Sequence, residues 1–121
     1  MQGQGLSDAA FHGDIAAIDR LLESGARIDA KDGDGFTALH RACVTGNVEV
    51  VQHLLGKGAK VNEEDAYGDS PLHYACFCGH EAVVKALVAA GADAMKKSND
   101  GKTPVQSAAE EGHMTTLDYL L

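Results

Sequence analysis

Large aromatic side chains and cysteines are both scarce in this chain. Its 121 residues include no tryptophan, three phenylalanines, three tyrosines and three cysteines. An odd number of cysteines at this low density excludes a secreted scaffold held by disulfides, which would need paired cysteines. The sequence therefore predicts an intracellular protein of a reducing compartment, the cytoplasm or the nucleus.

Positive charge and long hydrophobic runs are lacking too. Ten Lys and Arg residues stand against eighteen Asp and Glu residues, giving a formal net charge of −8. A nucleic-acid-binding protein needs the opposite excess to replace phosphate counterions. The longest apolar stretch, residues 82–90, is interrupted by Lys85, and a bilayer span needs roughly 20 apolar residues. Residues 1–7 are too polar for a signal peptide. We therefore expect neither nucleic acid nor a membrane as a partner.

Glycine, by contrast, is abundant and regularly spaced. The chain has fourteen glycines, about twice the average usage. Glycines, alanines and leucines recur 33 residues apart in one register: Gly13, Gly46, Gly79 and Gly112; Ala9, Ala42, Ala75 and Ala108; Leu21, Leu54, Leu87 and Leu120. This spacing predicts a single domain of four repeats, approximately residues 1–31, 32–64, 65–97 and 98–121.

Each repeat carries signals for two helices. Thr37, Ser70 and Thr103 are residues of the type that caps a helix N-terminus, and the following glycines tolerate the left-handed conformation that ends a helix. The second helix begins at another cap, Asp14 or Asn47, and we expect the one after Asn47 to end at Gly58. A polar segment, residues 62–68, then leads to the next repeat. Each unit is thus predicted to be a helix, a tight turn, a helix and a projecting turn.

The signature that opens each first helix reads Thr-Ala-Leu-His-Arg-Ala at residues 37–42 and Ser-Pro-Leu-His-Tyr-Ala at residues 70–75. With its period of 33, this pattern resembles the ankyrin repeat. The resemblance implies an all-α solenoid of stacked helix-turn-helix units with projecting β-turns. It also implies a non-enzymatic module that binds a partner protein through a concave surface of turns and first helices.

The first and last units depart from the family pattern, and one segment is similar to a particular ankyrin protein family. The first unit lacks the signature, and Gln106 stands where the fourth unit should have its histidine. Leu117, Leu120 and Leu121 are expected to be exposed at the free end, so we expect the chain to be a segment of a longer protein. Residues 71–77 are similar to one repeat of the integrin-linked kinases, a family of adhesion pseudokinases whose ankyrin segment binds a LIM-domain partner. That local likeness favours an adhesion or kinase-linked scaffold.

Two His–Cys pairs raise the question of a metal site. His40 with Cys43 and His73 with Cys76 each lie three residues apart, on one helix face. Zinc needs its ligands within about 2.0–2.3 Å, whereas stacked units place equivalent atoms about 10 Å apart. The resemblance implies instead that the signature histidine bonds turn to helix. Cys78 near His80 lacks an enclosing cleft. We expect no metal, no cofactor, no catalytic residue and no enzymatic activity.

Asn62 follows the second helix of its unit. Turn chemistry predicts that its side chain bonds the backbone of its own turn. The family resemblance implies an alternative, in which an asparagine at this place is hydroxylated by an asparaginyl hydroxylase in animal cells.

Five of the six aromatic residues fall in columns that the resemblance assigns to the concave surface. Aromatic residues and arginine are frequent anchors of protein interfaces. The candidate partner-binding residues are Phe11, Asp34, Phe36, Arg41, Val44, Tyr67, Asp69, Tyr74, Phe77 and Cys78. The rim around them is mostly acidic, which predicts a protein partner with an apolar or aromatic knob and basic neighbours. The chain itself is expected to be monomeric.

Two other functions compete with partner binding. The stack could be a spacer or an intramolecular clamp of a longer protein, with no affinity for outside proteins. Alternatively, Cys43, Cys76 and Cys78 could form a metal- or redox-sensing device.

Overall fold

A computed structural model of the protein describes residues 2–121, so Met1 of the predicted first unit lies outside the described residues. Over this range the chain forms helices and turns without a β-strand, and the all-α prediction is confirmed. The helices are α1 (Gln2–Phe11), α2 (Ile15–Glu23), α3 (Ala38–Thr45), α4 (Val48–Gly56), α5 (Pro71–Cys78), α6 (Glu81–Ala89), α7 (Pro104–Glu110) and α8 (Met114–Leu120).

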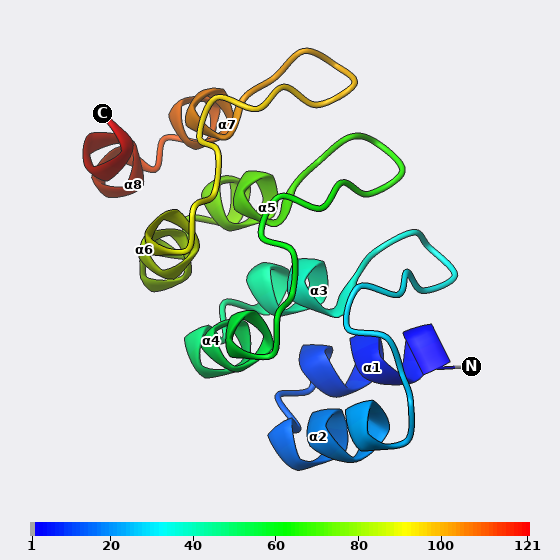
Figure 1. Ribbon diagram of the computed structural model, residues 1–121. Coiled ribbons are helices and arrows are strands. Elements are labelled where there is room, and N and C mark those ends of the chain that lie inside the picture. Colours follow the sequence, from blue (N-terminus) through cyan, green and yellow to red (C-terminus); the bar gives the residue numbers. More distant parts are fainter. Residues whose placement is uncertain (1) are drawn as a thin grey trace.

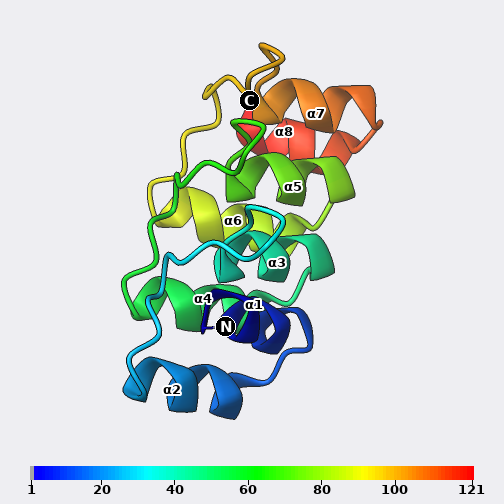
Figure 2. The same cartoon turned by 90° about the vertical axis from the view of Figure 1, so that its right-hand side faces the viewer.

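The helices form two layers of a stack that rises from the N-terminal to the C-terminal end (Figure 1). The inner layer contains α1, α3, α5 and α7, and each of these helices contacts the next along the chain. The outer layer contains α2, α4, α6 and α8 (Figure 2). Long turns project beside the inner helices, and we call the surface formed by inner helices and turns the concave face. None of the described helices is long and apolar enough to cross a membrane.

The inner helices begin and end where the sequence predicts. The side chains of Thr37, Ser70 and Thr103 each accept the backbone N–H three residues later, and the third helical residue bonds back to the cap. Gly46 ends α3 in the left-handed region, with φ 77°. The predicted stop at Gly58 is confirmed as well: α4 ends at Gly56, Lys57 is its C-cap, and Gly58 follows in the left-handed region with φ 95°. The backbone N–H groups of Gly58 and Ala59 bond the carbonyls of Leu55 and Leu54, the pattern that closes a helix at a left-handed glycine.

The core lies between the two layers and uses small and aliphatic side chains. Alanines of the inner helices are buried, as Ala42 and Ala75 show, and this lets neighbouring units approach closely. Leu54 and Leu87 are fully buried in the outer helices, but their counterparts Leu21 and Leu120 are only half-buried. Middle units have a neighbour on both sides, which completes their burial. This is the behaviour expected of a repeat stack, in which no single unit buries its own face.

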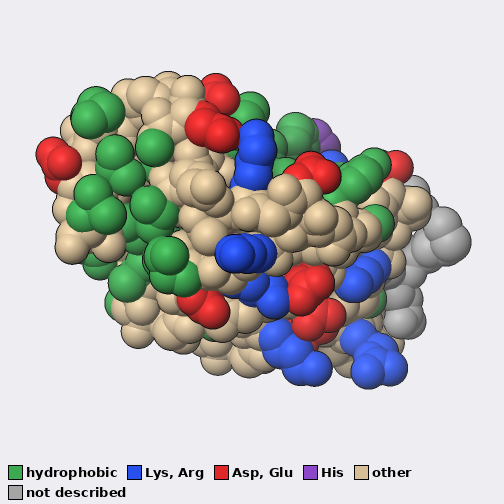
Figure 3. All heavy atoms as spheres, turned by 90° about the horizontal axis from the view of Figure 1, so that it is seen from above, with side chains coloured by type: hydrophobic (Ala, Val, Ile, Leu, Met, Phe, Trp, Pro, Cys, Tyr) green, Lys and Arg blue, Asp and Glu red, His purple; other side chains and the backbone are tan. Residues whose placement is uncertain are grey.

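Apolar side chains gather at the end of the stack where α8 lies (Figure 3). Leu121 is 85% exposed there, and Met114 is also exposed. The expectation for Leu117 and Leu120 was wrong, because both are half-buried against the core between α8 and its neighbours α6 and α7.

Side chains also join successive units to one another. Nε2 of His40 lies 3.0 Å from the carbonyl oxygen of Asp69, and Nε2 of His73 lies 2.9 Å from that of Lys102. Since a carbonyl only accepts, each Nε2 donates, and Nδ1 is left to accept the backbone N–H of the helix cap. The predicted bond from signature histidine to turn is therefore confirmed, and it crosses the unit boundary.

The prediction for Asn62 was wrong. Its side chain accepts the backbone N–H of Asp93 at 2.9 Å and donates to the carbonyl of Gly91 at 3.3 Å. Both partners belong to the next repeat rather than to its own turn. Stacking brings that backbone within reach, and a bond across the unit boundary replaces the local one.

Candidate functional site

Three exposed apolar side chains stand in line on the concave face. Phe11, Val44 and Phe77 occupy the same position of successive inner helices, 33 residues apart, and are 47%, 38% and 55% exposed. We call these three residues the apolar strip. The fourth residue of the column is Glu110, at the end of α7. Scattered exposed apolar residues are ordinary on protein surfaces, but these three share one column of the stack, and Val44 and Phe77 line the same hollow.

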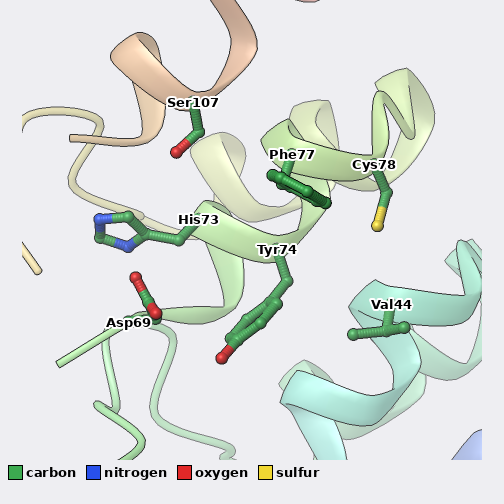
Figure 4. A pocket seen from close by; sticks show the side chains of 7 residues that line it. All are labelled: Val44, Asp69, His73, Tyr74, Phe77, Cys78 and Ser107. Carbon is green, nitrogen blue, oxygen red and sulfur yellow. The ribbon is translucent and has the colours of Figure 1, made fainter. Parts of the chain in front are cut away.

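A hollow of about 410 Å³ lies beside the strip (Figure 4). Its walls come from three inner helices and one turn: Val44 of α3, His73, Tyr74, Phe77 and Cys78 of α5, Ser107 of α7, and Asp69 of the turn before α5. We call it the Phe77 hollow. It is open to solvent and mostly apolar, and Asp69 brings the one carboxylate among the lining residues.

A second hollow of about 300 Å³ lies nearer the N-terminal end. It is lined by Asp8 and Phe11 of α1, by His12 directly after that helix, and by Arg41 of α3. Its polar lining distinguishes it from the Phe77 hollow. The apolar strip therefore runs past two hollows of different character.

Tyr74 is held within the protein rather than free on its surface. Its hydroxyl donates a hydrogen bond to the buried carboxylate of Asp65, in the turn before α5. Burial and this carboxylate raise the pKa of Tyr74 above its usual value. Its ring packs against the core and meets the ring of Phe36 edge to face, at 5.6 Å between centroids. Phe36 and Tyr74 therefore form part of the wall that supports the site.

Arg41 has a corresponding place one unit earlier. Its Nε donates to Oδ2 of Asp32 at 2.9 Å, and another guanidinium nitrogen donates to Asp34 at 3.1 Å. The guanidinium also lies 4.5 Å from the centroid of the Phe36 ring. Asp32 and Arg41, like Asp65 and Tyr74, are nine residues apart, so each pair ties a projecting turn to its own inner helix.

Unlike Asp32 and Asp34, Asp69 forms no ion pair with any residue in the described range. Partial burial raises the pKa of its carboxyl group, and Asp65 and Asp100 raise it further, while His73 opposes them. Two other acidic residues, by contrast, each have a cation: Glu64 pairs with Lys96, and Glu110 with Lys102.

The predicted partner-binding residues divide into three groups in the structure. Val44, Asp69, Tyr74, Phe77 and Cys78 are brought together around one hollow. Asp34, Phe36 and Arg41 form a connected cluster on the second unit. Phe11 lines the second hollow, and Tyr67 projects from a turn with 64% of its surface exposed, apart from both.

Sequence reasoning missed the two carboxylates that hold the turns, Asp32 and Asp65. They are themselves 33 residues apart, and each precedes a polar or aromatic inner-helix residue by nine. Within each turn, the carboxylate also accepts two backbone N–H groups. The shared column was the signal that could have identified them.

The three cysteines are shielded from solvent to different degrees, because Cys43 and Cys76 are buried and Cys78 is half-buried. Burial raises the pKa of all three thiols, that of Cys76 to about 12, and a thiol with a raised pKa is a poor nucleophile and metal ligand. No group of three His, Cys, Asp or Glu residues is placed to hold a metal ion anywhere in residues 2–121. Both ring nitrogens of His40 are already bonded, to Thr37 and to Asp69.

Comparison with protein families gives one match. A family model that describes ankyrin repeats in three copies matches residues 6–98. Four units were predicted from the sequence, and the match reaches only the start of the fourth. A search of curated proteins found no match to the chain.

Proposed function

Since the chain belongs to the ankyrin repeat family, whose members generally mediate protein–protein interactions, we propose that it binds another protein through its concave face. The contact would centre on the apolar strip of Phe11, Val44 and Phe77 and on the Phe77 hollow. No catalytic step is needed for this function.

The observation that carries the proposal is the exposure of the strip. Fully burying a large apolar side chain contributes roughly 1.5–3 kcal/mol relative to leaving it in water. The strip residues are already about half-buried, so covering all three beneath a partner would supply roughly 2–4 kcal/mol. A dissociation constant of 1 µM corresponds to about 8 kcal/mol. Three side chains in line can therefore account for a substantial part of a moderate affinity.

The rigidity of the surface supports the same function. The Asp32–Arg41 and Asp65–Tyr74 bonds hold two projecting turns against the helices that carry the strip. A surface that is ordered before binding loses little conformational entropy when the partner arrives. Little of the free energy gained from apolar contact is therefore offset by the entropy lost on ordering the surface.

The charge around the strip favours a basic partner. Asp34, Asp100, Glu110 and Glu111 are exposed on or next to the concave face, and the whole chain carries a net charge of −8. Acidic rims accelerate the encounter with basic surfaces and disfavour acidic ones. We therefore expect binding to weaken as the salt concentration rises.

Affinity capture from a cell lysate tests this function, using the wild-type chain beside a Phe11→Ala/Val44→Ala/Phe77→Ala variant. These positions suit the test better than Phe36 and Tyr74, whose rings also make internal contacts. Met95→Ala is the matched control, because Met95 is apolar and 66% exposed but lines neither hollow. The expected result is a protein retained by wild type and by the control and lost by the triple variant.

Two other results would change the assigned binding site or the proposed function. Equal retention by all three proteins would move the binding site to another face. Retention of nothing would favour the alternative function, a spacer or an intramolecular clamp.

A further inference from the structure

Resting on the proposed function, we propose that the Phe77 hollow receives an arginine side chain of the partner. Its guanidinium pairs with Asp69, and its flat face and aliphatic stem lie against the aromatic and apolar walls. Asp69 is then a specificity-determining residue, and the partner presents arginine beside an apolar group.

The second unit already contains such an arrangement within the protein. The guanidinium of Arg41 lies over the ring of Phe36 and bonds both Asp32 and Asp34. Cation, ring and carboxylates thus occur together on the concave face, with the cation supplied by the chain itself. An arginine on this surface gains from the ring and the carboxylates at once.

The third unit also has rings and carboxylates, at partly different positions, but it has no cation among them. Asp65 occupies the position of Asp32, Tyr74 that of Arg41, and Asp69 that of Phe36. The hydroxyl of Tyr74 donates a hydrogen bond to one carboxylate oxygen of Asp65, and two backbone N–H groups donate to the other oxygen. Asp69 remains at the hollow with its negative charge uncompensated.

No residue that lines the hollow supplies a cation to Asp69. His73 is the one candidate, but its Nδ1 accepts the backbone N–H of Ser70 and its Nε2 donates to the carbonyl of Lys102. Lys102 directs its own ammonium group to Glu110, at 3.0 Å. A partly buried carboxylate without a counterion is costly to the free protein, and a partner cation would remove that cost.

The shape and lining of the hollow favour arginine over lysine. Phe77 and Tyr74 offer aromatic surface, and Val44 contributes an aliphatic wall (Figure 4). The guanidinium group is planar, weakly hydrated and stacks on aromatic faces, whereas the lysine ammonium is a strongly hydrated point charge. The volume of about 410 Å³ leaves room for a long side chain, since it falls within the range of about 300–1,000 Å³ of small-molecule sites.

The test uses random 12-residue peptides displayed on phage and selected on the whole wild-type chain. Peptides whose binding falls at least tenfold in the Phe77→Ala variant are taken as occupants of the concave face. Among them we expect enrichment of arginine next to an aromatic or aliphatic residue. Synthetic versions are then measured with the arginine intact and with it replaced by citrulline, which keeps the shape and removes the charge.

Measuring the arginine and citrulline peptides against protein variants identifies the residue that binds the arginine. Binding of the arginine peptide should fall at least tenfold in Asp69→Asn and stay within twofold in Asp118→Asn. Asp118 is exposed on α8, so its variant makes the same change in net charge at a distance from the hollow. The citrulline peptide should bind wild type and Asp69→Asn equally. Denaturation midpoints of both variants show that they are folded.

The possible failures are distinguishable. Peptides that depend on Phe77 but show no arginine preference, or that bind Asp69→Asn as well as wild type, would overturn this inference and leave the proposed function standing. A selection that yields no peptide dependent on Phe77 would count against the proposed function itself, and the inference would fall with it.

Discussion

The hydroxyl of Tyr74 on α5 donates a hydrogen bond to the buried carboxylate of Asp65, nine residues earlier in the projecting turn. Arg41 makes the equivalent bond to Asp32 in the preceding unit. Two different side chains thus have the same role, because each holds a long turn against the helix that follows it. In the last unit the same positions are Ser98 and Ser107, and no side-chain bond joins that pair in the described structure.

Removing the Tyr74 hydroxyl should destabilise the fold. Tyr74→Phe leaves one oxygen of Asp65 buried without its donor, and an unsatisfied buried group of this kind costs about 1–3 kcal/mol. Chemical denaturation measures the change in the free energy of unfolding. Tyr67→Phe is the matched control, because Tyr67 is 64% exposed and its variant should match wild type. Equal stability of Tyr74→Phe and wild type would mean that the bond contributes nothing.

A methyl group at Gly46 should be more costly than one at Gly58. Both glycines have positive φ, 77° and 95°, a conformation that costs an alanine about 1–2 kcal/mol. At Gly46 the added Cβ would also lie 2.6 Å from the ring of His80, whereas at Gly58 nothing lies within 4 Å. We expect the free energy of unfolding to fall further in Gly46→Ala than in Gly58→Ala.

A double variant isolates that steric contact. His80→Ala removes the ring, so Gly46→Ala should cost less in its background than in wild type, although His80→Ala itself loses the bond to the carbonyl of Val44. A double-mutant cycle measured by denaturation gives the coupling. Additive costs would show that the ring moves aside freely.

The fold was predictable from the sequence because its signals are local and repeated. The cap at Thr37 and the stop at Gly46 act within one unit, and the register repeats the cap three times and the glycine, alanine and leucine columns four times. Helix boundaries follow from such short-range chemistry. Gly58 is a further example, since it follows the cap of α4 in the left-handed region and its N–H bonds the carbonyl of Leu55.

The division of the site into exposed and supporting residues was not predictable in the same way. Phe36 and Tyr74 pack against each other across a unit boundary, and Asn62 bonds the backbone of the next repeat. These contacts join residues about one repeat apart, so they depend on how the units stack. A single sequence assigns residues to a face of the stack, but the depth at which each one lies follows from the packing of neighbouring units.

Stability should decline as the pH falls below about 6.5. Burial lowers the pKa of His40 below its ordinary value of 6.5, against an opposing effect of the nearby backbone and Asp65. The unfolded chain therefore binds more protons than the folded protein between the lowered pKa and 6.5. The stability conferred by the neutral ring is fully present above pH 6.5 and is lost as the pH drops through this window.

A glutamine at position 40 tests this origin of the pH dependence. Gln106 holds the equivalent position in the last unit and accepts the backbone N–H of Thr103 at 2.8 Å, so His40→Gln keeps one capping bond without a titrating group. It loses the bond to the carbonyl of Asp69 and should be less stable at pH 7. Denaturation between pH 7 and pH 5 should show a shallower decline for His40→Gln. Equal slopes would assign the decline to another group.

Truncating Phe77 should change binding without changing the fold, because 55% of its surface is exposed. Surface substitutions usually alter the free energy of unfolding by less than about 0.5 kcal/mol, and we expect this of Phe77→Ala. Leu54→Ala is the contrast, because Leu54 is fully buried between the layers and such a truncation costs about 2–5 kcal/mol. Chemical denaturation of both variants and of wild type measures the two losses in the free energy of unfolding. A loss for Phe77→Ala that approaches the loss for Leu54→Ala would place the ring in the core and remove it from the binding surface. A small loss would show that the ring contributes little to the fold, so that a loss of binding in Phe77→Ala could be attributed to the missing contact with the partner.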